Sequence, residues 1–377
     1  MITKTERKSL RQFLVERIRT SGPMSFAEYM RSCLYDPKFG YYMRTPGERR
    51  PDYYTSVDMS PIFGRLIARQ LAEMWERMSC PTHFAIVECG AASGDLARQI
   101  LDFALAQRPE FYAGLHYSAV EISQPRRDRA GQALVAHISG GHASVSSELP
   151  DAVREGCILA NEFVDALPVH RIVMRGGALF EIFVDAHGDD LVERVGPLSS
   201  PDLSDFFARQ NVVLHEGQQA EVGLAACRWI EDVGRRLARG FVLIIDYGRE
   251  ARELYDERHM RGTLLACSGH RASEEFYRAP GEQDLTSHAN FTALDLWGRT
   301  RGLVRTGLTS QTNFLLALAR SSGFADLNQA DSGDLGGIRS RLQFKSLIFP
   351  EGMGEAFQVM VQHKGIPAPE LSGLAPL

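Results

Sequence analysis

An acidic residue stands two places before a glycine turn near residue 90. Residues 86–96 read IVECGAASGDL. Glycine at such a turn adopts positive φ angles and lets a ligand approach the main chain, while the helix that follows presents unpaired N–H groups. We therefore expect this turn to hold a nucleotide-like cofactor through Glu88, Gly90, Gly94 and Asp95.

A second acidic residue, Glu121, lies in an apolar run at residues 116–122. A parallel strand there would bring its carboxylate to the two hydroxyls of a ribose, as in NAD-binding proteins. Glu88 separates the two cofactor classes, because it would crowd the anionic pyrophosphate of NAD. S-adenosylmethionine (SAM) has no phosphate and carries a sulfonium and an ammonium group, so charge favours SAM. An NAD-dependent oxidoreductase stays an alternative, which is disfavoured because the sequence shows no obvious set of residues for hydride transfer.

An amide and two carboxylates follow an apolar run at residues 157–161. If this run is a strand, Asn161, Glu162 and Asp165 lie at its carboxyl end, where doubly wound sheets bind ligands. If SAM donates its methyl group here, an arginine side chain would be the most demanding acceptor, because a guanidinium titrates above ~12; a carboxylate pair could bind it and take up its proton. We predict that Glu162 and Asp165 are catalytic. We expect the amide of Asn161 to hold the target amine or the methionine moiety of SAM.

Each of these candidates also has a structural interpretation. Asn161 and Asp165 are residue types that cap turns and helices, and Glu162 could face solvent. We predict that Asp284 and His288 bind substrate, although the run from Asp284 is also typical of a helix start.

Thr55 and Ser56 are predicted to reach the cofactor from the N-terminal region, with loop hydrogen bonding as the alternative. We predict no metal site.

Periodicity and turn residues predict an α/β protein with a doubly wound sheet, an N-terminal helical lobe and an additional α+β lobe from insertions. We expect strands at 84–87, 116–122, 157–161, 171–174, 179–184, 241–248, 342–349 and 356–363. We expect helices at 10–18, 25–34, from 60, after 94, and at 124–135, 217–238 and 291–302, with another that begins at Thr312 or Asn313. Three regions follow: 1–59, a helical part of the active-site wall; 60–260, the cofactor-binding core with an insertion at about 170–215; and 261–377, a substrate-side segment that completes the sheet.

Composition favours a protein or small-molecule substrate over nucleic acid. The 377 residues include 42 basic and 47 acidic side chains, for a formal net charge of -5, which gives no basic field for nucleic acid. Six scattered cysteines without a C-x-x-C pair indicate thiols in a reducing compartment. Because we find no secretory signal, transit peptide or apolar span, we expect a cytoplasmic protein without membrane insertion. The oligomeric state is not predicted.

Several phrases of the sequence are distinctive. The most specific is NEFVDALP at 161–168, and the others include GPMSF at 22–26, DYYTS at 52–56 and PGEQDLTSH at 280–288. Together they resemble the MidA-like, mitochondrial complex I assembly-factor family of protein arginine methyltransferases. The resemblance covers nearly the whole chain. It implies a class I (Rossmann-like), SAM-dependent methyltransferase, and for eukaryotic members the dimethylation of an arginine in a core subunit of respiratory complex I.

One departure from the family lies in the glycine turn, which is usually richer in glycine. If position 92 approaches a ligand closely, the methyl of Ala92 narrows the pocket; if it is helical, alanine is favourable. We therefore predict a SAM-dependent protein arginine methyltransferase acting on a complex I subunit or an analogous protein. A non-catalytic assembly factor that retains the fold is the alternative.

Overall fold

The computed structural model describes residues 9–44, 61–269, 271–324, 342, 344–345, 347–348 and 356–376. The chain forms two compact units, each built from three segments. Unit 1 comprises Met1–Tyr53, Ala166–Cys227 and Arg249–Ala293, and unit 2 comprises Tyr54–Asp165, Arg228–Gly248 and Leu294–Leu377. The expected roles of region 1–59 as part of an active-site wall and of region 261–377 as a substrate-side segment stay predictions.

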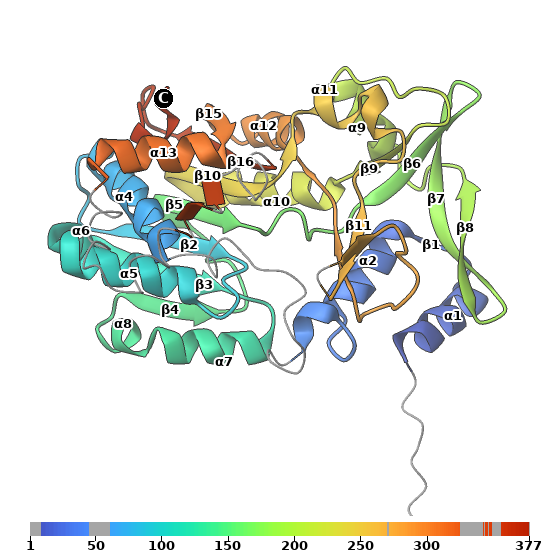
Figure 1. The fold of residues 1–377 in the computed structure, drawn as a ribbon, viewed down its shortest axis with the longest axis horizontal. Coiled ribbons are helices and arrows are strands. Elements are labelled where there is room, and N and C mark those ends of the chain that lie inside the picture. Colours follow the sequence, from blue (N-terminus) through green and yellow to red (C-terminus); the bar gives the residue numbers. More distant parts are fainter. Residues whose placement is uncertain are drawn as a thin grey trace, which may run out of the picture. The chain divides into compact units, whose positions relative to one another are not determined.

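Unit 2 contains a mixed sheet with the order β15-β16-β10-β5-β2-β3-β4 (Figure 1). Its strands are β2 (Phe84–Cys89), β3 (Leu115–Val120), β4 (Ala143–Ser146), β5 (Val153–Asn161), β10 (Leu237–Arg249), β15 (Val304–Ser310) and β16 (Phe357–Lys364). The strands from β10 to β4 are parallel, and β16 is antiparallel to both of its neighbours. The strand order reverses between β2 and β5, and sheets of this kind bind ligands at the carboxyl ends of the strands on either side of such a reversal.

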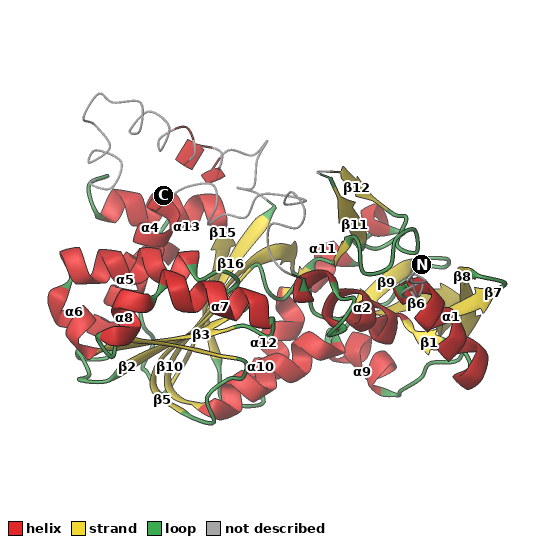
Figure 2. Ribbon diagram, turned by 90° about the horizontal axis from the view of Figure 1, so that it is seen from below, coloured by secondary structure: helices red, strands yellow, loops and turns green. Residues whose placement is uncertain are grey.

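Helices cover both faces of this sheet, and Figure 2 shows α5 and α7 on one side of the strands with α10 on the other. The helices are α4 (Pro61–Arg77), α5 (Asp95–Gln107), α6 (Pro109–Gly114), α7 (Gln124–Ala133), α8 (Val135–Ser139), α10 (Leu224–Arg236), α12 (Phe291–Arg299) and α13 (Gln311–Ser321), with the 3-10 turn η3 (Ser372–Leu374). One core joins the inner face of the sheet to α4, α5 and α13 through fully buried side chains such as Phe63, Tyr117, Phe241 and Phe314. This core fixes the strands that carry the predicted site.

Unit 1 is built on an antiparallel sheet with the order β1-β7-β6-β9, in which β8 also pairs with β7. Its strands are β1 (Met24–Ser25), β6 (His170–Arg175), β7 (Ala178–His187), β8 (Asp190–Gly196) and β9 (Gln219–Val222). A second sheet has the order β12 (Arg271–Ser273), β11 (Leu265–Ser268), β13 (Asp284–Thr286). The remaining elements are α1 (Leu10–Ser21), α2 (Phe26–Tyr35), α9 (Asp202–Arg209), α11 (Ala251–Leu254), β14 (Ala289–Asn290), η1 (Tyr41–Met43) and η2 (Glu257–His259).

Most predicted elements are present, with several differences. The helix expected at 217–238 begins only at Leu224, after β9, and several elements were not predicted, among them β4, β8, α9 and β15. The run that begins at Asp284 is strand β13 and not a helix start. In the segment expected as a strand at 342–349, the described residues are helical. Phe344 and Leu347 are buried there while Leu342 is 62% exposed, a spacing that fits a helix and not strand alternation.

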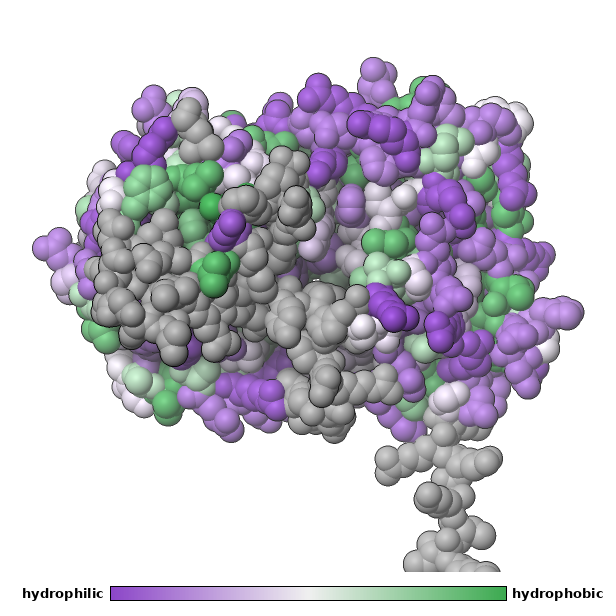
Figure 3. All heavy atoms as spheres, in the orientation of Figure 1, coloured by the Kyte–Doolittle hydropathy of each residue, from purple (hydrophilic) through white to green (hydrophobic). Residues whose placement is uncertain are grey.

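In the view of Figure 3, hydrophobic residues form separate spots among hydrophilic ones on the described surface. Such scattered apolar side chains are normal for a protein surface. Among the described residues, no helix combines the length and apolar character that a membrane crossing requires.

Candidate functional site

The glycine turn joins β2 to α5 in unit 2 and needs glycine at two positions. Gly90 has a φ of 74° and Gly94 a φ of 80°, a left-handed region that side chains rarely adopt. A Cβ atom on Gly90 would lie 2.9 Å from Cδ2 of Phe163, and one on Gly94 would lie 3.0 Å from Cα of Ala130. Both glycines are thus required by backbone conformation and by close packing.

Ala92 is also left-handed, with a φ of 46°. The interpretation in which position 92 is helical is therefore wrong. Its amide donates a hydrogen bond to Oε2 of Glu121 at 3.0 Å. The turn accepts a strained alanine, at a cost of about 1–2 kcal/mol, while its backbone holds the Glu121 side chain.

Glu121 follows β3 and is only 5% exposed. Besides the Ala92 contact, its Oε1 accepts a hydrogen bond from the amide of Ser123 at 2.8 Å. Each carboxylate oxygen therefore has one backbone donor and one further acceptor direction. This fixed geometry is suited to receiving two hydroxyl groups.

Glu88 lies near the end of β2 and is 4% exposed. The hydroxyl of Tyr117 donates to its Oε2 at 2.9 Å. Burial raises the pKa of Glu88 to about 7, the Tyr117 hydrogen bond opposes this rise, and the charges of Glu121 and Asp95 add to it. Asp95 begins α5, where its Oδ2 accepts from the Ser93 hydroxyl at 2.6 Å.

Three carboxylates therefore interact electrostatically around the turn, which tests its fit to a cofactor. A pyrophosphate would add negative charge to this cluster, whereas a sulfonium and an ammonium group would be attracted by it. The residues present fit SAM and disfavour NAD. Thr55 and Ser56, the other predicted cofactor contacts, lie outside the described residues.

Asn161 is the last residue of β5, and Glu162 follows in a left-handed conformation with a φ of 51°. Asn161 is 9% exposed, and its Nδ2 donates to Oε1 of Glu162 at 3.3 Å. Its Oδ1 is buried and has no hydrogen-bond partner in the described part of the chain. A buried acceptor without a donor is costly, so this atom points to a ligand that supplies an N–H group.

The loop after β5 depends on a residue that was not predicted as part of the site. Asp246, near the end of β10, is fully buried, and its Oδ2 accepts from the amides of Phe163, Val164 and Asp165. Burial raises its pKa well above the ordinary value, and the charge of Asp165 adds to this. The signal in the sequence was an aspartate at the carboxyl end of a second buried run.

The predicted substrate residues Asp284 and His288 belong to unit 1. Asp284 is buried in β13, and both of its carboxylate oxygens lie 2.9 Å from the donating hydroxyl of Tyr42. The amide of His288 donates to Oγ1 of Thr263 at 3.1 Å. Burial, with the charges of Arg249 and His259, lowers the pKa of His288 to about 4, so its ring is neutral at physiological pH.

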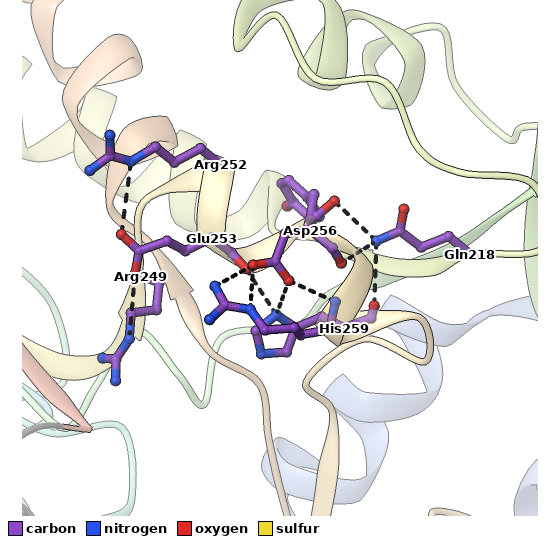
Figure 4. A network of polar contacts seen from close by, with 8 residues as sticks. Gln218, Arg249, Arg252, Glu253, Asp256 and His259 are labelled. Carbon is purple, nitrogen blue, oxygen red and sulfur yellow. Dashed lines mark hydrogen bonds and ion pairs between the residues drawn. The ribbon is translucent and has the colours of Figure 1, made fainter.

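Figure 4 shows the polar network around Arg249 and His259. Nε2 of Gln218 donates to the carbonyls of Tyr255, Asp256 and His259. Arg249 forms an ion pair with Glu253 at 3.8 Å. The Gln218 contacts close the turns after α11, and the ion pair joins α11 to the residue that precedes its N-cap, so the network has a structural explanation.

Comparisons with known proteins agree with the cofactor class that the charges around the glycine turn favour. Residues 66–309 match a family model for S-adenosyl-L-methionine-dependent methyltransferases. A solved Burkholderia thailandensis protein bound to S-adenosyl-homocysteine is 28% identical, with a TM-score of 0.87 over 97% of this chain and 94% of that one.

Curated relatives are similarly distant and cover most of the chain. A Drosophila melanogaster protein, the mitochondrial protein arginine methyltransferase NDUFAF7 homolog, is 29% identical over 96% of this chain and 86% of its own. The Homo sapiens mitochondrial protein arginine methyltransferase NDUFAF7 is 26% identical over 91% of this chain and 81% of its own.

Proposed function

The chain belongs to the family of S-adenosyl-L-methionine-dependent methyltransferases, and from this we propose that it methylates an arginine side chain of a protein. We further propose a subunit of respiratory complex I, or an analogous protein, as the acceptor. The arginine specificity is supported by the names of the curated relatives and by the family resemblance of the NEFVDALP phrase. Family membership also makes the NAD-dependent alternative wrong.

One observation in this chain carries the acceptor class: the buried Oδ1 of Asn161, next to the carboxylate of Glu162. A guanidinium has five N–H donors and no acceptor, so it complements an amide oxygen and carboxylates. We propose that Asn161, Glu162 and Asp165 grip and orient this group.

The same residues also provide an acceptor for the proton that methyl transfer releases. Methylation of a guanidinium nitrogen releases one proton, and the carboxylates of Glu162 and Asp165 could accept it. When bound, SAM supplies a methyl group activated by its sulfonium. The protein's own contribution is then to align the acceptor, exclude water and hold the proton.

We propose that Glu88, Gly90, Gly94, Asp95 and Glu121 hold SAM. Glu121 would bind the ribose, and the negative cluster around the turn would attract the cationic part. Thr55 and Ser56 are kept as further proposed contacts.

Asp284 and His288 are proposed on the substrate side, where a carboxylate and a neutral imidazole could bind a basic peptide. Their substitution should raise the KM for the protein acceptor more than that for SAM.

Among the described residues no cysteine forms a disulfide, and Cys33, Cys89, Cys157 and Cys227 are buried. Cysteines without disulfides are typical of a reducing compartment. We propose that the protein acts in the cytoplasm, without membrane insertion or nucleic acid. Cell fractionation with an antibody to the chain tests this placement.

Isothermal titration with SAM and transfer of a radiolabelled methyl group into a lysate test the function. We expect a SAM binding isotherm and one or a few labelled polypeptides with methylarginine. The variants E162Q and D165N keep side-chain size but cannot take up the proton, so turnover should fall by about 100-fold or more while SAM binding persists.

The matched control is D151N, because Asp151 is a fully exposed carboxylate of unit 2. It should keep the wild-type turnover. SAM binding without labelling of any polypeptide would favour the non-catalytic assembly factor, and label on a residue other than arginine would refute the proposed specificity.

A further inference from the structure

We propose that Asp246 is a positioning residue for methyl transfer, whose buried carboxylate fixes the loop at residues 162–165 and thereby orients Asn161 and Glu162. This inference rests on the function proposed above. It assigns a task to a residue that contributes no atom to the predicted acceptor site.

The first step is the position of Asp246 in the sheet. Strands β10 and β5 are parallel neighbours, and Ile245 pairs with Asn161. Asp246 therefore lies beside the point where β5 ends and the loop begins. It is fully buried, so its carboxylate must find its partners inside the protein.

The second step is the set of donors around this carboxylate. Oδ2 of Asp246 accepts from the amides of Phe163 at 3.1 Å, Val164 at 2.7 Å and Asp165 at 3.3 Å. Its Oδ1 accepts from the amide of Tyr247 at 2.9 Å. Successive amides that converge on one oxygen form a concave nest, and here the oxygen belongs to the Asp246 side chain. Without it, three neighbouring donors would lose their acceptor.

The third step is the strain that these contacts hold. Glu162 has a φ of 51°, which is unfavourable for a residue with a side chain. Its own amide donates to the carbonyl of Ile245 at 2.9 Å. The backbone is thus held by β10 both at Glu162 and directly after it, so the left-handed conformation depends on β10.

The fourth step connects the backbone to the predicted chemistry. The direction of the Glu162 side chain follows from its left-handed backbone, and Nδ2 of Asn161 donates to its Oε1 at 3.3 Å. This contact leaves Oδ1 of Asn161 as the atom that faces no donor within the described residues. If the loop relaxed, both side chains would turn, and the acceptor group would lose its alignment.

The experiment compares D246A and D246N with the wild-type protein in three measurements. These are the Kd for SAM by titration, amide hydrogen exchange of residues 162–166, and the rate of radiolabelled methyl transfer into a lysate at varied SAM. D246A should exchange faster at these amides and bind SAM within about twofold of wild type. Its rate at saturating SAM should fall by about 100-fold, because misplacement by about 1 Å has effects of this size.

D246N keeps an oxygen that can accept the loop amides but accepts more weakly than a carboxylate, so its rate should lie between those of D246A and wild type, about tenfold below wild type. D246N also tests the positioning role if D246A does not fold. In that case D246N must still exchange faster in the loop and turn over more slowly with an unchanged KM for SAM. Wild-type exchange and rate in D246N would then overturn the proposal.

Glu73 offers a matched control, because it is another carboxylate of unit 2 that accepts from a backbone amide distant in the chain. Its Oε1 and Oε2 accept from the amide of Ser372 at 3.1 and 2.9 Å. E73A should lose thermal stability and keep its rate at saturating SAM. An equal loss of rate in E73A and D246A, or a D246A rate at the wild-type level, would refute the positioning role. Absence of methyl transfer by the wild type would instead defeat the proposed function, while the exchange measurement would still test the hold of Asp246 on the loop.

Discussion

The affinity for SAM should depend on pH through Glu88. With a pKa of about 7, this carboxyl is ionised in about one molecule in ten at pH 6 and in about nine in ten at pH 8. A cationic ligand favours the ionised form, so affinity falls as pH falls through 7. If only the ionised form binds, the apparent Kd should rise about tenfold between pH 8 and pH 6.

Isothermal titration between pH 6 and pH 8 measures this change. Titrations at pH 7 in buffers with different ionisation enthalpies should also show the release of about half a proton for each SAM bound. The amino group of SAM itself has a pKa of about 7.7–8.0, and its titration contributes to the pH dependence of the affinity in every variant. E88Q provides the control, because it retains the ligand's titration and lacks that of Glu88.

The comparison of the two proteins decides the outcome. We expect E88Q to bind more weakly at pH 8 and to lose most of the dependence between pH 6 and pH 7. If wild type and E88Q show parallel profiles, or if wild-type affinity rises on acidification, then Glu88 does not act as a charged partner of the cofactor.

Three further predictions concern the glycine turn. Because the folded pKa of Glu88 is raised, its contribution to stability is present below its ordinary pKa and is lost as pH rises through 7. At pH 8 and without SAM, the unfolding free energy of E88Q in urea titrations should therefore exceed that of wild type by on the order of 1–3 kcal/mol. Equal stabilities of the two proteins would contradict this. A92G removes the left-handed alanine, and its unfolding free energy should rise by about 0.5 kcal/mol after the entropy of glycine is subtracted. Ala91 is buried and has no positive φ, so A91G should lower the unfolding free energy by about 1–2 kcal/mol. A lower stability for A92G than for A91G would refute the strain argument. G90A should lose about 2 kcal/mol or more, since its methyl would lie 2.9 Å from Phe163, and a melting temperature at the wild-type value would exclude that contact.

The parts of the fold that local pattern determines could be predicted from the sequence. The capping box of Ser25 and Glu28 begins α2 as expected, and the buried runs at β2, β5 and β10 are continuous apolar segments. The start of helix α10 was predicted too early in the sequence: we expected the helix from Gly217, but strand β9 comes first and the helix begins at Leu224. Strand β15 is partly exposed along its length, so it lacks the alternation that marks a half-buried strand.

The candidate site was predictable as residue types at strand ends, but not as a set of contacts. The sequence indicated Glu88 and Glu121 as ligands for a cofactor, yet it could not show that Tyr117 donates to Glu88 or that the amide of Ala92 holds Glu121. These contacts join residues that are far apart in the chain, and they arise only when the parallel strands align. For the same reason the support of the 162–165 loop by Asp246 required the structure.

The last strand of the larger sheet has a consequence for biosynthesis. β16 lies between β10 and β15 and pairs with both along most of its length. A nascent chain that has not yet released residues 357–364 from the ribosome leaves the hydrogen-bonding edge of β10 without its antiparallel neighbour, and exposed edges invite pairing with other chains. We therefore expect a chaperone requirement late in translation, and aggregation of any product that ends before residue 357.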